Sequence, residues 1–315
     1  MAPPAPPDPP AADPPATDPP ATASPTVIRP LSEADVAAAE QVGWDALDVA
    51  GQRYGFSMGE RDAERIRFAQ GRVRHLLATD PDGAAVAERD GEIVGVTLAL
   101  RRGSLWFLSL LAVRTDVQGG GVGRRLLEAA LRTADDAERG MICASPDPKA
   151  LCRYRRAGFA LHATLEGKGT PDRAALPAGL GVREGDWAAD ADLAEQLVAG
   201  RRGEPYGPDL AVGRDAGARL LVLDGGSPQD RAVACVRSGG IGPVAATSES
   251  AGRRVLTAAI AEGGDDVRVA YLTGNQQWAV DAALDAGLAL RPTGALCTRG
   301  YAEPPTPYLP SGIFG

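Results

Sequence analysis

The first half of the chain opens with one short apolar run followed by two helical patterns. Residues 26–30 (TVIRP) contain two adjacent β-branched apolar residues and a closing proline, and they predict a short strand. Ser32 is placed to cap a helix over residues 36–49. Apolar positions then recur at helical spacing among arginines from 60 to about 77, which predicts a second helix.

After these helices the period changes from helical to alternating. Residues 84–88 and 93–100 flank Asp90-Gly91, a pair that favours the tight turn of a hairpin. Residues 105–113 are almost continuously apolar, as in strands that are covered on both faces. The pattern therefore predicts a sheet in which this third strand is central.

A glycine-rich turn at residues 118–123 comes next and leads into a helix that is predicted to end near Gly140. A strand at 141–144, a helix at 149–157 and a strand at 159–165 complete the pattern of an α+β domain. The apolar stripe of the helix after the turn consists of Leu126, Leu127, Ala130 and Leu131.

The second half of the chain repeats the first at a shift of 129 positions, which carries Gly123 onto Gly252. Residues 252–259 (GRRVLTAA) match residues 123–130 (GRRLLEAA), and residues 287–290 (GLAL) match residues 158–161 (GFAL). Two separate matches at one shift indicate a duplication.

The two copies differ at the positions where a residue could bind a ligand or take part in catalysis. At the same shift the QGGG of residues 118–121 falls on TSES at 247–250, and Tyr154 falls on Ala283. The second copy is therefore expected to keep the apolar skeleton and to lack the glycine-rich turn.

A length of 315 residues with 44% hydrophobic content is enough for two domains of ordinary size. Proline, alanine, aspartate and threonine make up most of residues 1–25, which predicts a disordered tail. The expected organisation is this tail, an α+β domain at 26–168, a linker at 169–180 and a second domain at 181–315.

Charge and cysteine usage exclude several classes of partner. The net charge of −8 argues against a nucleic acid or an anionic membrane as a partner. The sequence shows neither a secretory signal nor a long apolar segment, so a cytoplasmic protein is expected. No metal is expected, because the four cysteines are far apart in the sequence and match no zinc-type spacing: Cys143, Cys152, Cys235 and Cys297.

The glycine-rich turn after an apolar strand is suited to binding a phosphate at the start of a helix. It is not a P-loop, because no Lys-Ser or Lys-Thr follows the glycines. It is not a dinucleotide fingerprint either, because Arg124 or Leu126 stands where the last glycine is needed. The remaining pattern, Gln/Arg-x-x-Gly-x-Gly/Ala, is met by Gln118, Gly121 and Gly123.

Together with the strand end before it, this turn resembles the GNAT superfamily of acyl-CoA-dependent N-acetyltransferases. The resemblance is carried by LAVRTDVQGGGVGR at 111–124 and by ALCRYRRAGF at 150–159, which is similar to the family's Ala-x-x-x-Tyr-x-x-x-Gly-Phe signature. It covers residues 26–166 strongly and residues 181–300 weakly.

The resemblance implies two tandem GNAT-like α+β domains, each with a mixed, mostly antiparallel central sheet flanked by helices. It implies acetyl-CoA as co-substrate and transfer of the acetyl group to a primary amine, most simply that of a small molecule. A non-catalytic acyl-CoA-binding sensor or scaffold is the alternative, and a homodimer is one assembly open to the chain. The residues implied in cofactor binding are Leu111, Ala112, Val113, Gln118, Gly119, Gly120, Gly121, Val122, Gly123 and Arg124.

The resemblance also assigns catalytic roles. Tyr154 matches the tyrosine that donates a proton to the leaving CoA thiolate. Ser109 stands where many members carry a carboxylate that acts as general base, and a serine can at most hold a water there. Asp147 is expected to cap the next helix, while His75 and His162 have no positional support as a base.

Two further segments have a weaker assignment. The segment around the first two helices occupies the part of the family fold that shapes the acceptor site, and its arginines, among them Arg65 and Arg72, would suit a carboxylate-bearing small molecule. Residues 303–315 end with apolar positions that could dock onto a domain.

Overall fold

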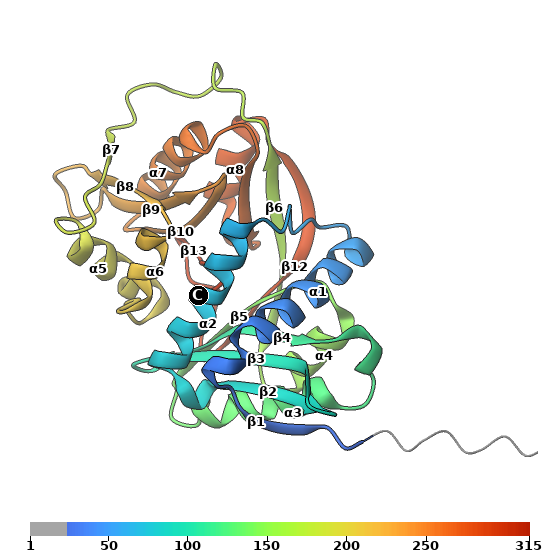
Figure 1. The fold of residues 1–315 in the computed structure, drawn as a ribbon. Helices are drawn as coiled ribbons and strands as arrows, with labels where there is room; N and C mark the ends of the chain where they lie inside the picture. Colours follow the sequence, from blue (N-terminus) through green and yellow to red (C-terminus); the bar gives the residue numbers. More distant parts are fainter. Residues whose placement is uncertain (1–23) are drawn as a thin grey trace, which may run out of the picture.

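The computed structural model describes residues 24–315, so the tail predicted at 1–25 lies almost entirely outside the described residues. The first half of the chain supplies six strands and four α-helices (Figure 1). In chain order they are β1 (Val27–Pro30), α1 (Val36–Tyr54), α2 (Ala63–Thr79), β2 (Ala84–Arg89), β3 (Glu92–Arg102), β4 (Leu105–Val113), α3 (Val122–Leu131), β5 (Arg139–Ala144), α4 (Pro148–Arg156) and β6 (Ala160–Gly169).

The second half follows a similar order of elements. It comprises β7 (Val182–Glu184), α5 (Ala191–Arg202), α6 (Asp209–Asp215), β8 (Arg219–Asp224), β9 (Arg231–Arg237), β10 (Gly240–Ala246), α7 (Glu249–Glu262), β11 (Val267–Leu272), α8 (Gln277–Asp285), β12 (Ala289–Arg299) and β13 (Tyr308–Leu309). The shift of 129 positions carries α4 onto α8 residue for residue, and the start of β6 onto the start of β12.

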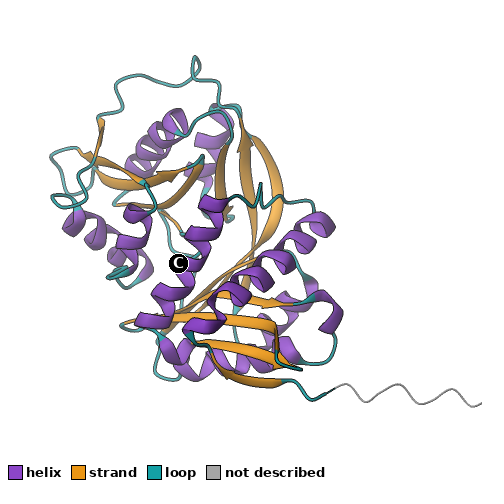
Figure 2. Ribbon diagram, in the orientation of Figure 1, coloured by secondary structure: helices purple, strands orange, loops and turns teal. Residues whose placement is uncertain are grey.

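All described strands belong to one sheet, in the order β1-β2-β3-β4-β5-β12-β6-β11-β10-β9-β8-β7, with β13 beside β10. Only two neighbouring pairs of this sheet are parallel, β4 with β5 and β10 with β11. The other pairs are antiparallel, so the observed class is the predicted mixed, mostly antiparallel α+β fold with helices on both faces (Figure 2).

The two halves exchange their last long strands. The strand β12 lies between β5 and β6, and β6 in turn lies between β12 and β11 (Figure 1). Each half therefore contributes one strand that pairs with strands of the other half. The order of equivalent strands is the same when the sheet is followed from either edge. Local sequence patterns do not predict this, because the partner of β5 is more than a hundred residues away in the chain.

Helices from both halves share one core. Val42 of α1, Leu76 of α2 and Leu197 of α5 are buried in a single apolar cluster with the facing side chains of the sheet. The opposite face of the first half is covered by α3 and α4. In β4, Phe107 points into the first cluster and Trp106 into the second, which confirms that this central strand is covered on both faces.

Several element boundaries differ from the sequence predictions. The first helix runs five residues further, to Tyr54, and the second begins at Ala63 because Asp62 caps it by accepting a hydrogen bond from the Arg65 amide. The prediction that the helix after the glycine turn ends near Gly140 is wrong, because α3 ends at Leu131.

The α-helix α3 passes directly into a 3-10 turn over Arg132–Ala134. In this turn the Thr133 hydroxyl donates to the Ala130 carbonyl (2.8 Å) and accepts from the Trp106 indole (3.0 Å). Residues from Arg139 onward then form β5 beside Leu105 of β4. Within residues 24–315, no helix is long and apolar enough to cross a membrane.

Candidate functional site

The site lies where two parallel strands separate. Pairing between β4 and β5 runs from Leu105 to Leu108 on β4 and stops there. On its other side β4 stays paired with β3 as far as Val113. The edge of β4 from Ser109 to Val113 is therefore free of strand pairing within the described residues, and its amide and carbonyl groups face the opening.

The glycine loop follows this free edge directly. Gly119 and Gly121 have φ values of +97° and +80°, a backbone region that suits glycine and strains other residues. Gly121 is the N-cap of α3 and has no side chain with which to cap it. The Gln118 side chain donates to the Val113 carbonyl (3.0 Å) and fixes the loop to the strand end. The start of α3 thus presents backbone N–H groups beside the opening.

A small cavity of about 90 Å³ joins the strand edge to the loop. Gly120 and Arg124 do not line it, although the sequence places them in the same motif. Tyr154 lines it as well. The predicted cofactor-binding residues that do line it are Leu111, Ala112, Val113, Gln118, Gly119, Gly121, Val122 and Gly123.

Tyr154 comes from α4, which begins at Pro148 and carries Asp147 as its N-cap. The Asp147 carboxylate accepts a hydrogen bond from the Lys149 amide (2.9 Å), so the predicted capping role is confirmed. The Tyr154 ring is buried against the core cluster that contains Trp106. Burial raises the pKa of the Tyr154 phenol well above its ordinary value, and the hydroxyl stays protonated at neutral pH.

The family assignment follows from the sequence around these elements. A family model described as an acetyltransferase (GNAT) domain matches residues 69–169, which run from within α2 through the end of β6. This stretch is a GNAT acetyltransferase domain. The free edge of β4, the glycine loop and Tyr154 all lie within it.

A curated relative matches a limited part of the chain. The mycothiol acetyltransferase of Streptomyces avermitilis is 38% identical over 90 residues, which are 27% of this chain and 29% of the relative. The match therefore spans less than a third of either protein.

Two solved structures resemble the chain over most of its length. A candidate acetyltransferase from Pyrococcus horikoshii covers 92% of this chain and 96% of its own, with a TM-score of 0.71 and 16% identity. A GCN5-related N-acetyltransferase from Sphaerobacter thermophilus covers 87% of this chain and 95% of its own, with a TM-score of 0.56 and 16% identity. At these identities the likeness concerns the fold, and it extends over both halves of the chain.

A second, larger cavity of about 370 Å³ is also lined by Tyr154. Ser109 lines it, and its hydroxyl is buried without a hydrogen-bond partner among residues 24–315. The first two helices contribute Glu40, Arg65 and Arg72 to the wall. Both Arg65 and Arg72, expected from the sequence to shape an acceptor site, therefore face the same cavity as Ser109 and Tyr154.

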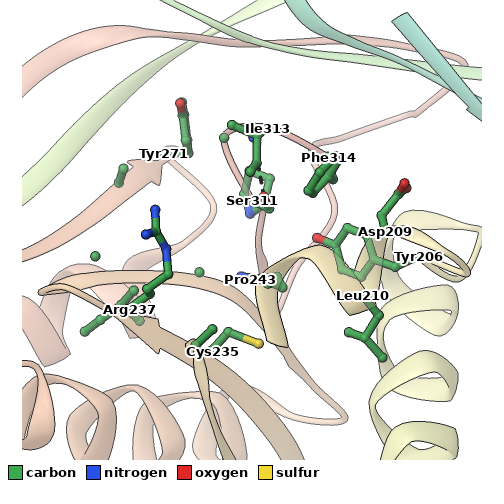
Figure 3. A pocket seen from close by; sticks show the side chains of 18 of the residues that line it. Tyr206, Asp209, Leu210, Cys235, Arg237, Pro243, Tyr271, Ser311, Ile313 and Phe314 are labelled. Atoms are coloured by element: carbon green, nitrogen blue, oxygen red, sulfur yellow. Dashed lines mark hydrogen bonds between the residues drawn. The ribbon is translucent and has the colours of Figure 1, made fainter. Parts of the chain in front are cut away.

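Sequence reasoning missed the part of this wall that belongs to the second half. Arg237 of β9, Arg268 and Tyr271 of β11, and Ile313 all line the same cavity. A neighbouring cavity of about 290 Å³ shares these residues, and Figure 3 shows its far wall, where Ser311, Ile313 and Phe314 reach in from the C-terminal segment. Phe314 is buried, so the predicted docking of the apolar C-terminal positions is confirmed.

Neither histidine lines the two cavities beside Tyr154. His75 is hydrogen-bonded to Asp209 (2.7 Å), and His162 to Thr298 (3.0 Å). Within residues 24–315 no group of three His, Cys, Asp or Glu side chains could hold a metal ion.

The basic side chains of the two motifs differ in their surroundings. Arg153 lines the small cavity beside the loop. Arg114 is engaged by Asp116 and Glu92 (both 2.8 Å), and Arg124 lies 3.6 Å from the carboxylate of Glu128. Of these, Arg153 is the one placed next to the opening.

The corresponding opening in the second half has no glycine loop. Only Thr247 and Ser248 separate β10 from α7, and the Ser248 side chain caps the helix by accepting from the Ala251 amide (3.1 Å). One N–H group of this helix start is thus already bound by the protein itself. Glu249 adds a negative charge to its first turn.

The C-terminal segment fills the space between β10 and β11. Its strand β13 pairs with β10 through Leu309 and Tyr308, on the edge where β11 no longer pairs. The buried Gln276 amide donates to the carbonyls of Pro305 (2.7 Å) and Tyr308 (2.6 Å). The repeat shift of 129 positions carries Asp147, the N-cap of α4, onto Gln276, the N-cap of α8. Asp147 lines the small cavity, whereas Gln276 binds the C-terminal segment.

Proposed function

We propose that the chain is an acetyl-CoA-dependent N-acetyltransferase that acetylates a primary amine of a small molecule by direct attack on the thioester. The observation that carries this proposal is the position of Tyr154. It lines both the small cavity beside the glycine loop and the larger cavity beyond it. A proton donor between a cofactor site and an acceptor site is what acyl transfer to an amine needs.

In this proposal the cofactor lies along the free edge of β4. The amides of its pantetheine arm pair with the backbone of Leu111 and Val113, as an added strand would. Its pyrophosphate binds the N–H groups of the loop and of the first turn of α3. Arg153, which lines the same cavity, is placed to contribute positive charge. The family membership supports this arrangement, and the assignment of the individual residues is our prediction.

Tyr154 is proposed as the acid that protonates the leaving thiolate. An acid for this step has to be protonated at neutral pH and must have a pKa near or above that of a thiol. The buried phenol meets the first requirement. Transfer of the phenol proton neutralises the CoA thiolate as the C–S bond breaks, and the phenolate regains a proton that the attacking amine has released to water.

Ser109 is proposed to hold the attacking amine, or a water that takes up its proton. Its unpartnered hydroxyl is the polar group that β4 offers to the larger cavity. A neutral serine cannot act as a base unaided, so the amine must lose its proton to water or arrive unprotonated. Ser109→Ala is expected to raise the KM of the amine with a smaller effect on kcat.

The second half is proposed to bind no CoA. Its strand edge is covered by β13, and the start of α7 is capped by Ser248. The identity of the acceptor amine does not follow from the relatives that are named for mycothiol, because the match covers 29% of the Streptomyces avermitilis protein.

The test is release of free thiol from acetyl-CoA in the presence of a panel of primary amines. We expect release above the rate without amine, and appearance of the N-acetylated amine. Tight CoA binding with no thiol release for any amine would favour the alternative, a non-catalytic acyl-CoA sensor.

A further inference from the structure

The larger cavity collects positive charge from both halves of the chain. Arg65 and Arg72 reach it from α2, and Arg237 reaches it from the end of β9. None of the three has a carboxylate within ion-pair distance among residues 24–315. Three guanidinium groups of like charge around one cavity repel one another unless an anion lies between them.

Arg72 is the most exceptional of the three. Its Nε is buried and has no hydrogen-bond partner within the described part of the chain. Burial lowers the pKa of Arg72 to about 10, so the group is still charged at neutral pH. A buried polar atom without a hydrogen-bond partner is costly, and a ligand atom that accepts from the Arg72 Nε would remove this cost.

Arg237 lines the same cavity as Arg72 and comes from the other half of the molecule. Its guanidinium lies over the ring of Phe68 at 4.0 Å, and Figure 3 shows it extending from β9 toward the side that carries Tyr271. Burial lowers the pKa of Arg237, and the positive charge of Arg65 lowers it further, while the charge of Glu64 raises it in part. An anion bound beside Arg237 would reduce the electrostatic repulsion between Arg237 and Arg65.

The carboxylates near this cavity already have partners. Glu40 in the wall is bound to Arg61 (2.6 Å). Glu166 holds the remaining wall arginine, Arg268 (2.6 Å). The charge of Glu40 still raises the pKa of Arg72 in part. Neither carboxylate, however, forms an ion pair with Arg72 or Arg237.

We propose, building on the proposed acetyl transfer, that the acceptor carries a carboxylate as well as its amine, and that Arg72 and Arg237 bind this carboxylate. The amine then lies toward Ser109 and Tyr154, which line the same cavity. The aromatic rings of Trp44 and Phe56 form the apolar part of the wall. A volume of about 370 Å³ is suited to a free amino acid or a short derivative of one.

The test compares acceptors that differ in the carboxylate alone. Each standard amino acid is paired with its amide, and β-alanine and 4-aminobutyrate are paired with theirs. The KM of at least one free acid is expected to be tenfold or more below that of its amide. Equal values within every pair, or preference for the amides or for O-phosphoethanolamine, would overturn the carboxylate assignment.

Variants separate recognition of the carboxylate from folding. Arg72→Gln and Arg237→Gln are expected to raise the KM of the preferred acid tenfold or more, and to leave the KM of its amide and kcat within a factor of three. The unliganded Arg72→Gln protein should melt at the same temperature as the wild type or higher, because an unpaired buried charge has been removed. Arg67→Gln is the matched control, since Arg67 is an exposed residue of the same helix outside this cavity.

A binding measurement keeps this proposal distinct from the enzymatic one. The same pairs are titrated calorimetrically into the complex with CoA, which requires no turnover. Binding of the acid but not of its amide, lost in Arg72→Gln, supports the anion site even if no thiol is released. If thiol is released from uncharged amines while acids and amides bind alike, acetyl transfer stands and the carboxylate site is wrong.

Discussion

At the scale of single residues, the chemistry depends on groups that burial leaves without protein partners. The Ser109 hydroxyl and the Arg72 Nε are both buried and unsatisfied, and both line the larger cavity. Buried polar groups are normally paired, so unpaired ones that share a cavity indicate where a ligand binds. Tyr154 adds a proton donor to the same place.

Tyr154→Phe tests the acid at this scale. We expect kcat to fall by about 100-fold, because the leaving thiolate must then take its proton from water. The KM for acetyl-CoA should change little, since the ring still packs against the core. The matched control is Cys152→Ala, which alters an exposed residue of the same helix and should leave kcat within a factor of two. A kcat of Tyr154→Phe equal to that of the wild type would remove the tyrosine from the mechanism.

At the scale of elements, the sequence predicts the local units well and their ends less well. The Asp90-Gly91 hairpin and the buried strand β4 are confirmed, because turn chemistry and apolar period are properties of adjacent residues. The predicted end of α3 is wrong by several residues, because the α-helix passes into a 3-10 turn over Arg132–Ala134, where the Trp106 indole donates to the Thr133 hydroxyl. That contact joins two elements and has no local signature.

The glycine loop is the element whose prediction matters most for function. Gly121→Glu adds a carboxylate and a side chain at a φ of +80°, although a Cβ there meets no other atom within 4 Å. We expect CoA affinity to fall at least 100-fold, because a negative charge enters the proposed phosphate site, while the fold loses about 1–2 kcal/mol from backbone strain.

The control for this variant lies in the second half. Glu249→Gly removes the carboxylate from the first turn of α7, and it should leave CoA affinity and stoichiometry unchanged. Calorimetric titration with CoA measures both variants. Undiminished binding by a folded Gly121→Glu protein would place the cofactor elsewhere.

The exchanged strands are joined by ion pairs between one buried carboxylate and two partly exposed arginines. The fully buried Glu166 of β6 accepts from Arg268 of β11 (2.6 Å) and from Arg291 of β12. Burial alone would raise the pKa of Glu166, but the charges and hydrogen bonds of the two arginines lower it below its ordinary value. The ionised carboxylate therefore stabilises the folded state.

Glu166→Gln should lower the free energy of unfolding by about 2 kcal/mol at pH 7. Because the folded pKa is depressed, the difference from the wild type should be constant above about pH 5. It should shrink as the pH falls below the unfolded pKa of about 4.3. Denaturant unfolding at a series of pH values measures this. Glu92→Gln, which removes an exposed partner of Arg114, should cost less than about 0.5 kcal/mol; an equal cost would show that burial of Glu166 adds nothing.

At the scale of the whole molecule, the two halves that the sequence repeat indicates form a single sheet, in which they exchange the strands β6 and β12. Periodicity and motif spacing predicted the class of fold and the repeat. They did not predict that β12 lies beside β5, or that Arg237 faces a cavity of the first half. Both depend on pairing between segments far apart in the chain. The acceptor side of the proposed site is therefore the part that sequence reasoning left incomplete.

The C-terminal segment closes the second copy of the site, and Gln276 holds it there. Gln276→Ala leaves the carbonyls of Pro305 and Tyr308 without their buried donor, and we expect a loss of about 2 kcal/mol in unfolding free energy. Gln277→Ala, at the next position and exposed, should change stability by less than about 0.5 kcal/mol. Equal effects of the two variants would mean that Gln276 does not hold the segment.

The central claim is that the first half binds CoA and the second half does not. The most direct test of this claim is the number of CoA molecules bound per chain. Calorimetric titration of the wild-type protein with CoA should give one molecule per chain. This binding should be lost in Gly121→Glu and retained in Glu249→Gly. Two molecules per chain, or one that survives Gly121→Glu, would contradict the assignment of the glycine loop at 118–123 as the single cofactor site.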